Sequence, residues 1–390
     1  MQKSSQKKLL SAIIALFWFG QYVYVPYQTV YLGQLGIPAS YIGIVIGAYG
    51  GFQLLLRFPI GIMADQTNRH KRQVLFSLAA SGTASLLRAL IPSGASFLIA
   101  NLLSGIGSAM WMSYILLFSA LFGEEDRRNV MGQTVLFQNI GVMSGFILSS
   151  LLYARFGMTF LCIASVLAAI TALILLSFVR ESPSAPRKVP TRELVGVYKD
   201  RTLVGFSLLT LVQQGIQAAT AMSFTAQKLR ALGASDQIIG LSAVFYMLVA
   251  VISARIFSSP WGNRREPSFW IPALFALFAL YCCVVGFSQR IALIFAAQII
   301  PGLGNGILLP LLTSEAVRKM PQEKMSSSMG FFQSIYSLGI LFYPMIAGAL
   351  LRRFSWEVAL CIMGATAIPC CIVSKITYKN RCKLNEGGQR

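Results

Sequence analysis

Amide and phenol side chains are the polar groups that recur inside the long apolar runs of this chain. They donate and accept hydrogen bonds without carrying charge at neutral pH, so they suit the binding of a polar solute better than acid–base catalysis. A polar group within a long apolar segment usually faces a cavity or a hydrogen-bonding partner on another helix, and both interpretations are open for each residue. The candidate cavity residues are Gln21, Tyr24, Tyr27, Gln28, Asn101, Tyr114, Gln138, Gln213, Gln214, Gln217, Tyr246, Gln298, Asn305, Gln333 and Tyr336.

Three arginines, Arg57, Arg88 and Arg255, carry the formal charges inside these runs. A guanidinium there could hold an anionic group, and Arg57 is the candidate charged site. Each arginine lies near the end of its run, so we expect its charged head to extend toward water. All 13 Asp and Glu residues fall in loops or at helix ends. The sequence therefore shows no buried carboxylate of the kind that couples transport to protons.

Catalytic and metal-binding constellations are not expected. The single histidine, His70, has no nearby Ser, Cys or acidic array with which to form an active site. The seven cysteines include no CxxC pair, and most lie within apolar runs, where a thiol is an ordinary small filler. We predict no enzyme activity, no metal site and no cofactor, and a small neutral, amphipathic or weakly anionic organic solute as ligand.

The elements that carry these residues are apolar runs long enough to cross a bilayer. Apolar residues make up 55% of the 390 residues and charged residues 12%, about half the charged share of a soluble domain. Since hydrocarbon offers the backbone no hydrogen-bonding partner, each run must be a helix, and the fold class is an all-α membrane protein. We predict twelve transmembrane helices, at residues 9–32, 41–62, 73–92, 96–118, 130–153, 158–180, 203–226, 238–258, 269–288, 292–313, 329–351 and 356–375.

The formal charge of +20 would suggest nucleic acid as a partner if the protein were soluble. The basic residues are instead scattered between the predicted spans, without a dense basic run, so no nucleic-acid partner is expected. They are concentrated at both termini, in the central linker and in alternate loops, and cytoplasmic loops are enriched in Lys and Arg. We predict a multi-pass protein of the cell membrane with both termini in the cytoplasm.

A polar, proline-rich segment divides the chain near its middle. We predict a six-helix bundle at 1–180, a cytoplasmic linker at 181–202, a second six-helix bundle at 203–375 and a cytoplasmic tail at 376–390. The two halves repeat one another at an offset of 197 or 198 residues: Leu35 and Gly36 recur as Leu232 and Gly233, and Gly132 recurs as Gly330. Such a duplication is typical of transporters built from two parallel repeats.

The loop between the second and third spans carries a recognisable pattern, Gly61, Asp65, Arg69, Lys71 and Arg72. It resembles the signature loop of the major facilitator superfamily, and the resemblance extends over the whole chain. The loop departs from the family pattern at Gln66, Asn68 and His70. In the fourth span, Asn101 occupies the position of a family arginine. The fifth span has Gly132, Gly141 and Gly145 at the antiporter spacing, but Val142 and Phe146 break that motif.

The resemblance implies two pseudo-symmetric six-helix bundles whose spans 1, 4, 7 and 10 line a central cavity. It also implies that Asp65 faces the N-terminal end of the eleventh span, where Met325–Ser328 resembles a helix N-cap sequence. The carboxylate and the positive helix end would form a cytoplasmic latch, which opens when the two halves change their relative orientation. The alternative is a solvated turn whose basic residues only set topology.

The predicted function is secondary active transport of a small organic solute by alternating access. Efflux of a drug-like or metabolite compound is slightly favoured, because the expected cavity is aromatic and uncharged. The alternatives are a nutrient or organic-anion uptake permease and a transport-dead membrane sensor or scaffold of the same fold. The expected partners are the solute, protons or another coupling ion, and the lipid bilayer, with the protein as a monomer.

Overall fold

Helices account for nearly all of the described chain, which in this computed structural model comprises residues 3–66, 70–121, 127–181, 190–257 and 266–387. No strand occurs within these ranges. The helices of the first half are α1 (Lys3–Tyr22), α2 (Val25–Gln34), α3 (Ala39–Gln66), α4 (His70–Leu90), α5 (Gly94–Ala109), α6 (Trp111–Ser119) and α7 (Arg127–Ser177).

A short helix, α8 (Thr191–Val195), precedes the second half. The helices of that half are α9 (Arg201–Ala219), α10 (Thr225–Ala231), α11 (Asp236–Phe257), α12 (Pro267–Phe287), α13 (Ile291–Ala297), α14 (Ile299–Leu303), α15 (Leu309–Val317), α16 (Met325–Arg353), α17 (Trp356–Ala365) and α18 (Ala367–Gly387).

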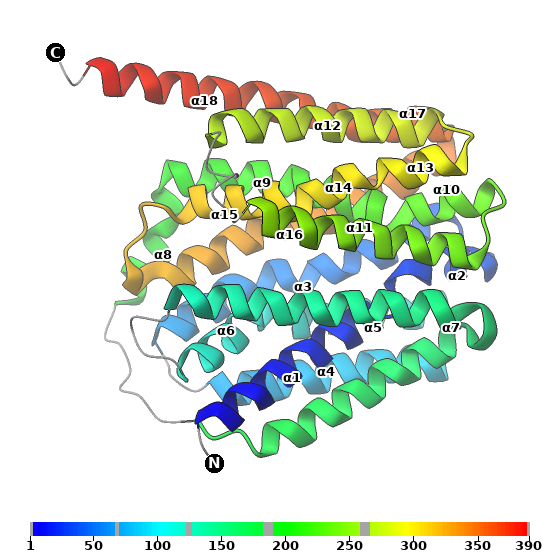
Figure 1. Ribbon diagram of the computed structural model, residues 1–390, viewed down its shortest axis with the longest axis horizontal. Coiled ribbons are helices and arrows are strands. Elements are labelled where there is room, and N and C mark those ends of the chain that lie inside the picture. The colour runs from blue at the N-terminus through cyan, green and yellow to red at the C-terminus, as the bar shows by residue number, and fades with distance from the viewer. Residues whose placement is uncertain (1–2, 67–69, 122–126, 182–189, 258–265, 388–390) are drawn as a thin grey trace.

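The predicted twelve transmembrane helices are confirmed. Ten helical stretches of the described chain are long and apolar enough to cross a membrane. One of them, Gln133–Ser177, contains two spans, because α7 reverses direction at Gly157, whose φ of +70° only glycine adopts without strain (Figure 1). The remaining span, Arg201–Ala231, is helical but less apolar because it carries four glutamines.

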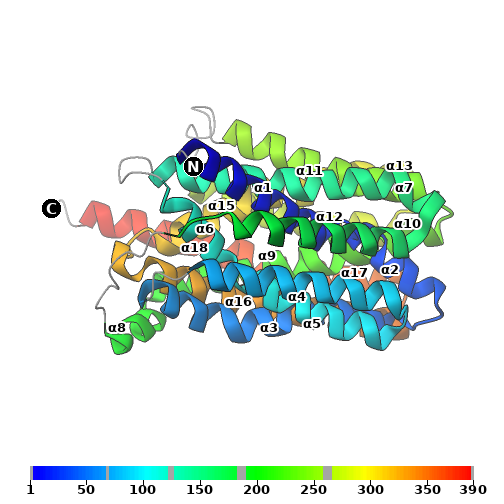
Figure 2. The same ribbon diagram turned by 90° about the horizontal axis from the view of Figure 1, so that it is seen from below.

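The start of α1, the end of α18 and α8 all lie at one end of the bundle, which we call the linker end (Figures 1 and 2). The turn within α7 and the helices α2, α10 and α17 reach the opposite end, which we call the far end. This arrangement agrees with an even number of spans, since both described termini share one side.

Two long helices, α3 and α16, join the halves through close packing along most of their length. A Cβ on Gly50 would lie 2.6 Å from the backbone nitrogen of Leu341, and a Cβ on Gly61 would lie 2.6 Å from the carbonyl oxygen of Ser326. Glycine at these positions lets the two backbones approach, as small residues do at membrane helix interfaces.

The spans that the resemblance assigns to the central cavity are interrupted at matching positions. Span 1 breaks between α1 and α2 at residues 23–24, and span 4 breaks between α5 and α6 at Met110. Spans 7 and 10 each contain a π-helical turn, at Thr220–Phe224 and Gly304–Leu308. An offset of 197 places residue 23 on 220 and residue 110 on 307, so the repeat is visible in the backbone geometry as well as in the sequence.

Large apolar side chains cover the outside of the bundle. Leu55, Leu90, Leu151, Phe178 and Phe287 are all exposed. Exposed apolar surface on this scale is a liability in water but matches the hydrocarbon core of a bilayer. The protein is therefore a multi-pass membrane protein, and these side chains contact lipid.

Candidate solute-binding cavity

A cavity of about 1110 Å³, counted with its open mouth, takes its walls from both halves. A concave space lined by apolar and aromatic side chains with a few polar groups is the form that small-molecule sites take. Spans 1, 2, 4, 5, 7, 8, 10 and 11 all contribute side chains to it. The sequence-predicted residues on this wall are Gln21, Tyr24, Gln28, Arg57, Asn101, Gln138, Gln214, Gln217, Asn305 and Tyr336.

The helix interruptions adjoin the cavity. Tyr24 follows the break in span 1, and Ser108 precedes the break in span 4. Met222 and Asn305 lie within the two π-helical turns and line the same wall. Discontinuous helices and π-turns mark binding sites in many membrane transporters, because the local unwinding frees polar groups for a ligand.

Three of the predicted residues bind neighbouring helices instead of lining this cavity. The Tyr114 hydroxyl donates to Ser77 Oγ at 3.0 Å, and Gln298 Nε2 donates to Ser242 Oγ at 3.1 Å. Tyr246 accepts from Gln217 Nε2 at 2.6 Å. Tyr246 and Gln298 line a smaller pocket of about 340 Å³, counted in the same way. None of these three residues is on the wall of the larger cavity, because each side chain is directed to its hydrogen-bond partner, and their contact with a solute stays a prediction.

Gln213, Gln333 and Tyr27 are also not on the wall of this cavity. Gln213 stands behind the wall and donates from Nε2 to Gln217 Oε1 at 2.8 Å. Gln333 contributes its backbone oxygen as an acceptor for Arg57, while its side chain is not on the wall. Tyr27 is fully buried at the far end, in a contact between the halves.

The second span supplies a polar stripe that the sequence analysis missed apart from Arg57. Tyr49, Gln53 and Arg57 follow one another at intervals of four residues, which places them on one face of α3, and all three line the cavity. The four-residue spacing of these polar side chains could have identified this cavity-facing side of the second span from the sequence. The other wall residues that were missed are Trp18, Tyr22, Val25, Ile46, Ser108, Asn139, Val142, Ala218, Met222, Ser223, Met247, Leu309 and Ile340.

Arg57 is 5% exposed and faces neutral groups only among the described residues. Its Nη1 lies 3.5 Å from the carbonyl oxygen of Gln333 and 3.4 Å from Ser337 Oγ, and its Nη2 lies 3.4 Å from Ser108 Oγ. These are long hydrogen bonds, and Nε has no partner. The guanidinium also lies 5.0 Å from the ring centroid of Tyr336, a cation–π distance.

Arg88 is buried beside the cavity wall. Its Nη2 donates to Asn101 Oδ1 at 2.6 Å and to Ser104 Oγ at 2.9 Å, and its guanidinium covers the Tyr24 ring at 4.1 Å. Asn101 also accepts from Gln28 Nε2 at 3.1 Å. The expectation that arginine heads extend to water is thus wrong for Arg57 and Arg88, because each finds polar and aromatic partners inside the bundle.

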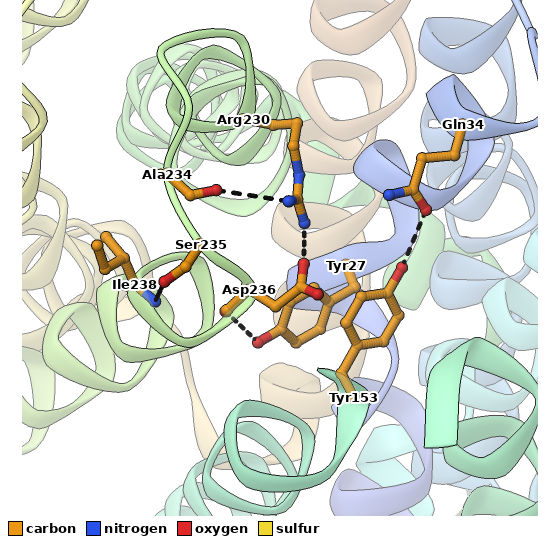
Figure 3. Close-up of polar contacts among 8 residues, drawn as sticks. All are labelled: Tyr27, Gln34, Tyr153, Arg230, Ala234, Ser235, Asp236 and Ile238. Carbon is orange, nitrogen blue, oxygen red and sulfur yellow. Dashed lines mark hydrogen bonds and ion pairs between the residues drawn. The ribbon is translucent and has the colours of Figure 1, made fainter. Parts of the chain in front are cut away.

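A polar cluster ties the halves together at the far end (Figure 3). Tyr27 of the first half donates from its hydroxyl to the backbone oxygen of Asp236 in the second half, at 2.6 Å. Arg230 forms an ion pair with the Asp236 carboxylate, and the Tyr27 ring stacks on Tyr153 with centroids 3.8 Å apart. Tyr153 in turn donates to Gln34 Oε1 at 3.3 Å within the first half. Within this cluster, the bond from Tyr27 to Asp236 joins the two halves at the far end.

At the linker end, the signature loop is anchored to the end of span 6. The Glu181 carboxylate accepts from the backbone nitrogens of His70 and of Lys71, the latter at 3.1 Å, and so caps the positive N-terminal end of α4. Lys71 Nζ donates to the carbonyl oxygen of Val179 at 2.6 Å. Sequence reasoning missed Glu181, since nothing in the linker composition links it to α4. Arg72 is exposed.

The side chain of Asp65, and Arg69 altogether, lie outside the described residues. The backbone nearby places Gly61 against Ser326, close to the start of α16. The predicted cap at Met325–Ser328 is wrong, because these residues already form the first helical turn and Lys324 is the N-cap residue. Lys324 makes no side-chain capping hydrogen bond.

Comparison with known proteins identifies one family over nearly the whole chain. The family model of the Major Facilitator Superfamily matches residues 10–229 and 206–381. The chain is 22% identical to the multi-drug resistance efflux pump PmrA of Streptococcus pneumoniae, over 96% of this chain and 98% of that protein. It is 28% identical to an uncharacterised MFS-type transporter of Salmonella typhimurium, over 86% of each chain.

A solved structure agrees with the fold. The POT family transporter PepTSo superposes with a TM-score of 0.81, covering 96% of this chain and 98% of that one. The sequences are 12% identical, so this similarity concerns the fold alone.

Proposed function

Because this chain belongs to the major facilitator superfamily, we propose that it is a secondary transporter that carries a small organic solute through the central cavity by alternating access. The observation that carries this proposal is the position of the cavity. It lies between the two repeats, beside the matching interruptions of spans 1, 4, 7 and 10. A solute bound there contacts both halves, so a change in their relative orientation changes which end it can reach.

The far-end cluster and the signature loop are the candidate gates. In this conformation Tyr27 and Asp236 join the halves at the far end, and this bond must break for the cavity to open there. At the linker end, the close approach of Gly61 to Ser326 supports a latch in which Asp65 interacts with the start of α16.

We assign the direction as efflux of a drug-like or metabolite compound. The similarity to the efflux pump PmrA over almost the full length of both chains supports this direction. Trp18, Tyr22, Tyr49 and Tyr336 give the cavity aromatic walls that suit a flat apolar solute. Charge placement supports a cytoplasmic location of both termini.

Flux in proteoliposomes of known orientation tests the proposal. A panel of metabolites and drugs is offered with and without an imposed pH gradient, and transported compounds are identified by mass spectrometry. Export of at least one compound supports the proposed direction, and net uptake instead supports the permease alternative. Binding without flux for every compound contradicts transport and supports a sensor or scaffold.

A substitution that fills the cavity, compared with a matched substitution on the outer surface, tests whether the cavity is the transport path. Ala218 lines the cavity, whereas Ala365 is exposed on the outside of α17. Ala218→Trp should abolish flux by filling the binding space, and Ala365→Trp should transport as the parent chain does. Monodisperse elution of both variants in detergent shows that each is folded. Equal flux through both variants would contradict the assignment of this cavity as the transport path.

A further inference from the structure

Arg57 is a charged group in the wall of the cavity, and it has no counter-ion among the residues that the structure describes. Its three hydrogen bonds to neutral acceptors are 3.4–3.5 Å long, and its Nε makes none. No Asp or Glu occurs among the described wall residues. A buried charge is costly unless it is paired, and a planar guanidinium pairs best with a carboxylate, through two parallel hydrogen bonds.

Gln53 is a second, independent sign that a polar ligand belongs here. It lies one helical turn from Arg57 on the same face of α3 and lines the same cavity. Its side chain is 0% exposed, and neither its amide nitrogen nor its carbonyl oxygen has a hydrogen-bond partner. Buried side-chain amides are nearly always hydrogen-bonded, so a donor and an acceptor are left for a ligand.

A second buried cation makes this side of the cavity more positive. Arg88 lies behind the wall and is held by Asn101, which itself faces the cavity. Its Nε and Nη1 have no partners, and its charge is not balanced by a carboxylate hydrogen bond. In a low-dielectric interior this field attracts an anion and repels a cation.

Aromatic rings surround the space next to Arg57. Tyr49 donates to Ser108 Oγ at 2.9 Å, and the same oxygen accepts from Arg57, so the ring and the guanidinium are held together. Tyr336 stacks its ring against the guanidinium, and Trp18 and Tyr22 lie on the wall from span 1. An apolar or aromatic body would fill this region while a charged group reaches Arg57.

We propose that the solute is an organic acid, with its carboxylate bound to Arg57 and Gln53 and its apolar body between the tyrosines of the cavity. The guanidinium supplies the charge and two aligned donors, and Gln53 Nε2 supplies a further donor. This inference rests on the transport function proposed above, and it restricts that function to anionic compounds.

Ligand binding to the purified full-length chain in detergent tests the assignment without requiring transport. The probes are aromatic carboxylic acids of one to three rings, each paired with its primary amide and with the matching amine, so that the body is constant and only the charge changes. Affinity is measured by calorimetry and by ligand-induced thermal stabilisation at pH 7. At least one acid should bind about tenfold or more tightly than its amide, with the amine weakest.

Substitutions at Arg57 and Gln53 test whether these residues cause the preference for the acid over its amide. Arg57→Gln should remove the preference for the acid, and Arg57→Lys should keep part of it, because the charge remains while the paired donors are lost. Gln53→Leu should weaken binding of the acid while the preference over the amide remains. Arg255→Gln is the control, since Arg255 is exposed and does not line the cavity; it should behave as the parent chain does.

The proposal is wrong if no acid binds more tightly than its amide, if amines bind best, or if Arg57→Gln retains the preference of the parent chain. These results are separable from a failure of the transport function. Acid binding that depends on Arg57 but yields no flux in proteoliposomes keeps the site and rejects transport. Flux of neutral or cationic compounds without acid binding keeps transport and rejects the site.

Discussion

The hydrogen bond from Arg88 to Asn101 explains why the fourth span can carry an asparagine at this position. Asn101 occupies a position where the family resemblance led us to expect an arginine. The structure brings a guanidinium to the same place from the third span, since Arg88 donates to Asn101 Oδ1 at 2.6 Å. Asn101 also donates from Nδ2 to the carbonyl oxygen of Val45, so it connects α4, α5 and α3. The charge is retained although its carrier differs.

Asn101→Ala should therefore destabilise the protein. The substitution leaves the buried Arg88 with fewer acceptors and removes the bonds to Val45 and Gln28, at a cost of about 1–3 kcal/mol. The measurement is the apparent unfolding temperature in detergent. Asn139→Ala is the control, because Asn139 is only half-buried on the same cavity wall. Equal unfolding temperatures for the two variants would show that the network contributes nothing.

At the scale of elements, α3 packs against α16 backbone to backbone at both ends of the bundle, and a glycine of α16, Gly348, faces Ala39 near the far end. Hydrogen bonds from α2 add to this packing, one from Tyr27 to the backbone oxygen of Asp236 and one from Thr29 Oγ1 to the backbone oxygen of Ser223. Near the linker end, Gly61 of α3 packs directly against the backbone of α16. A hydrogen bond can break and re-form without loss of packing, so the far-end tie is suited to repeated opening.

Tyr27→Phe should shift the protein toward conformations that are open at the far end. Losing one hydrogen bond of about 0.5–1.5 kcal/mol changes the ratio of closed to open forms roughly two- to tenfold. Distances between spin labels at Leu35 and Ser235, both at the far end, report this shift. We expect a larger population at long distance than in the parent chain.

Tyr153→Phe is the matched control for this experiment. It deletes the same atom from the other ring of the stack, but its bond to Gln34 lies within the first half. Its distance distribution should match that of the parent chain. If Tyr27→Phe gives that distribution as well, the bond to Asp236 does not hold the far end closed.

Asp65→Asn should slow turnover while the protein remains inserted and folded. The proposed latch depends on the attraction between a carboxylate and the positive N-terminal end of α16, which the neutral amide weakens. Initial flux rates across solute concentrations measure the effect, with Glu266→Gln, at the start of α12, as a control for the loss of an acidic residue at the linker end. Unchanged rates at every concentration would count against the latch.

For the whole molecule, orientation in the membrane follows from charge. The described termini and α8 share the linker end, and the basic residues are concentrated in the segments that the sequence assigns to the same side. Because cytoplasmic loops are enriched in Lys and Arg, the linker end should face the cytoplasm.

Reporter fusions measure this orientation. A green fluorescent protein fused after Arg390 should fluoresce, and alkaline phosphatase at the same site should be inactive, because each reporter folds on only one side of a bacterial inner membrane. Fusion of the reporters into the turn at Gly157, at the far end, should give the opposite result. An active phosphatase at the C-terminus would overturn the predicted topology.

Most of the fold could be predicted from the sequence, because it depends on local quantities. The length of each apolar run decides whether it crosses the bilayer, and the constant offset between the halves reveals the repeat. The seventh span, predicted at residues 203–226, is less apolar than the stretches that are apolar enough to cross a membrane, because it carries Gln213, Gln214 and Gln217. Two of these amides, Gln214 and Gln217, line the cavity.

The site was predicted only in part, because composition does not fix where a side chain points. Gln217 and Gln213 are one helical turn apart and chemically identical, yet Gln217 lines the cavity while Gln213 lies behind it and bonds to Gln217. The sequence by itself determined the helices, their repeat and the polar residues available to a ligand. Only the tertiary structure decided which of those residues face the cavity and that Arg57 stays inside it, because both depend on the rotation of each helix against neighbours distant in sequence.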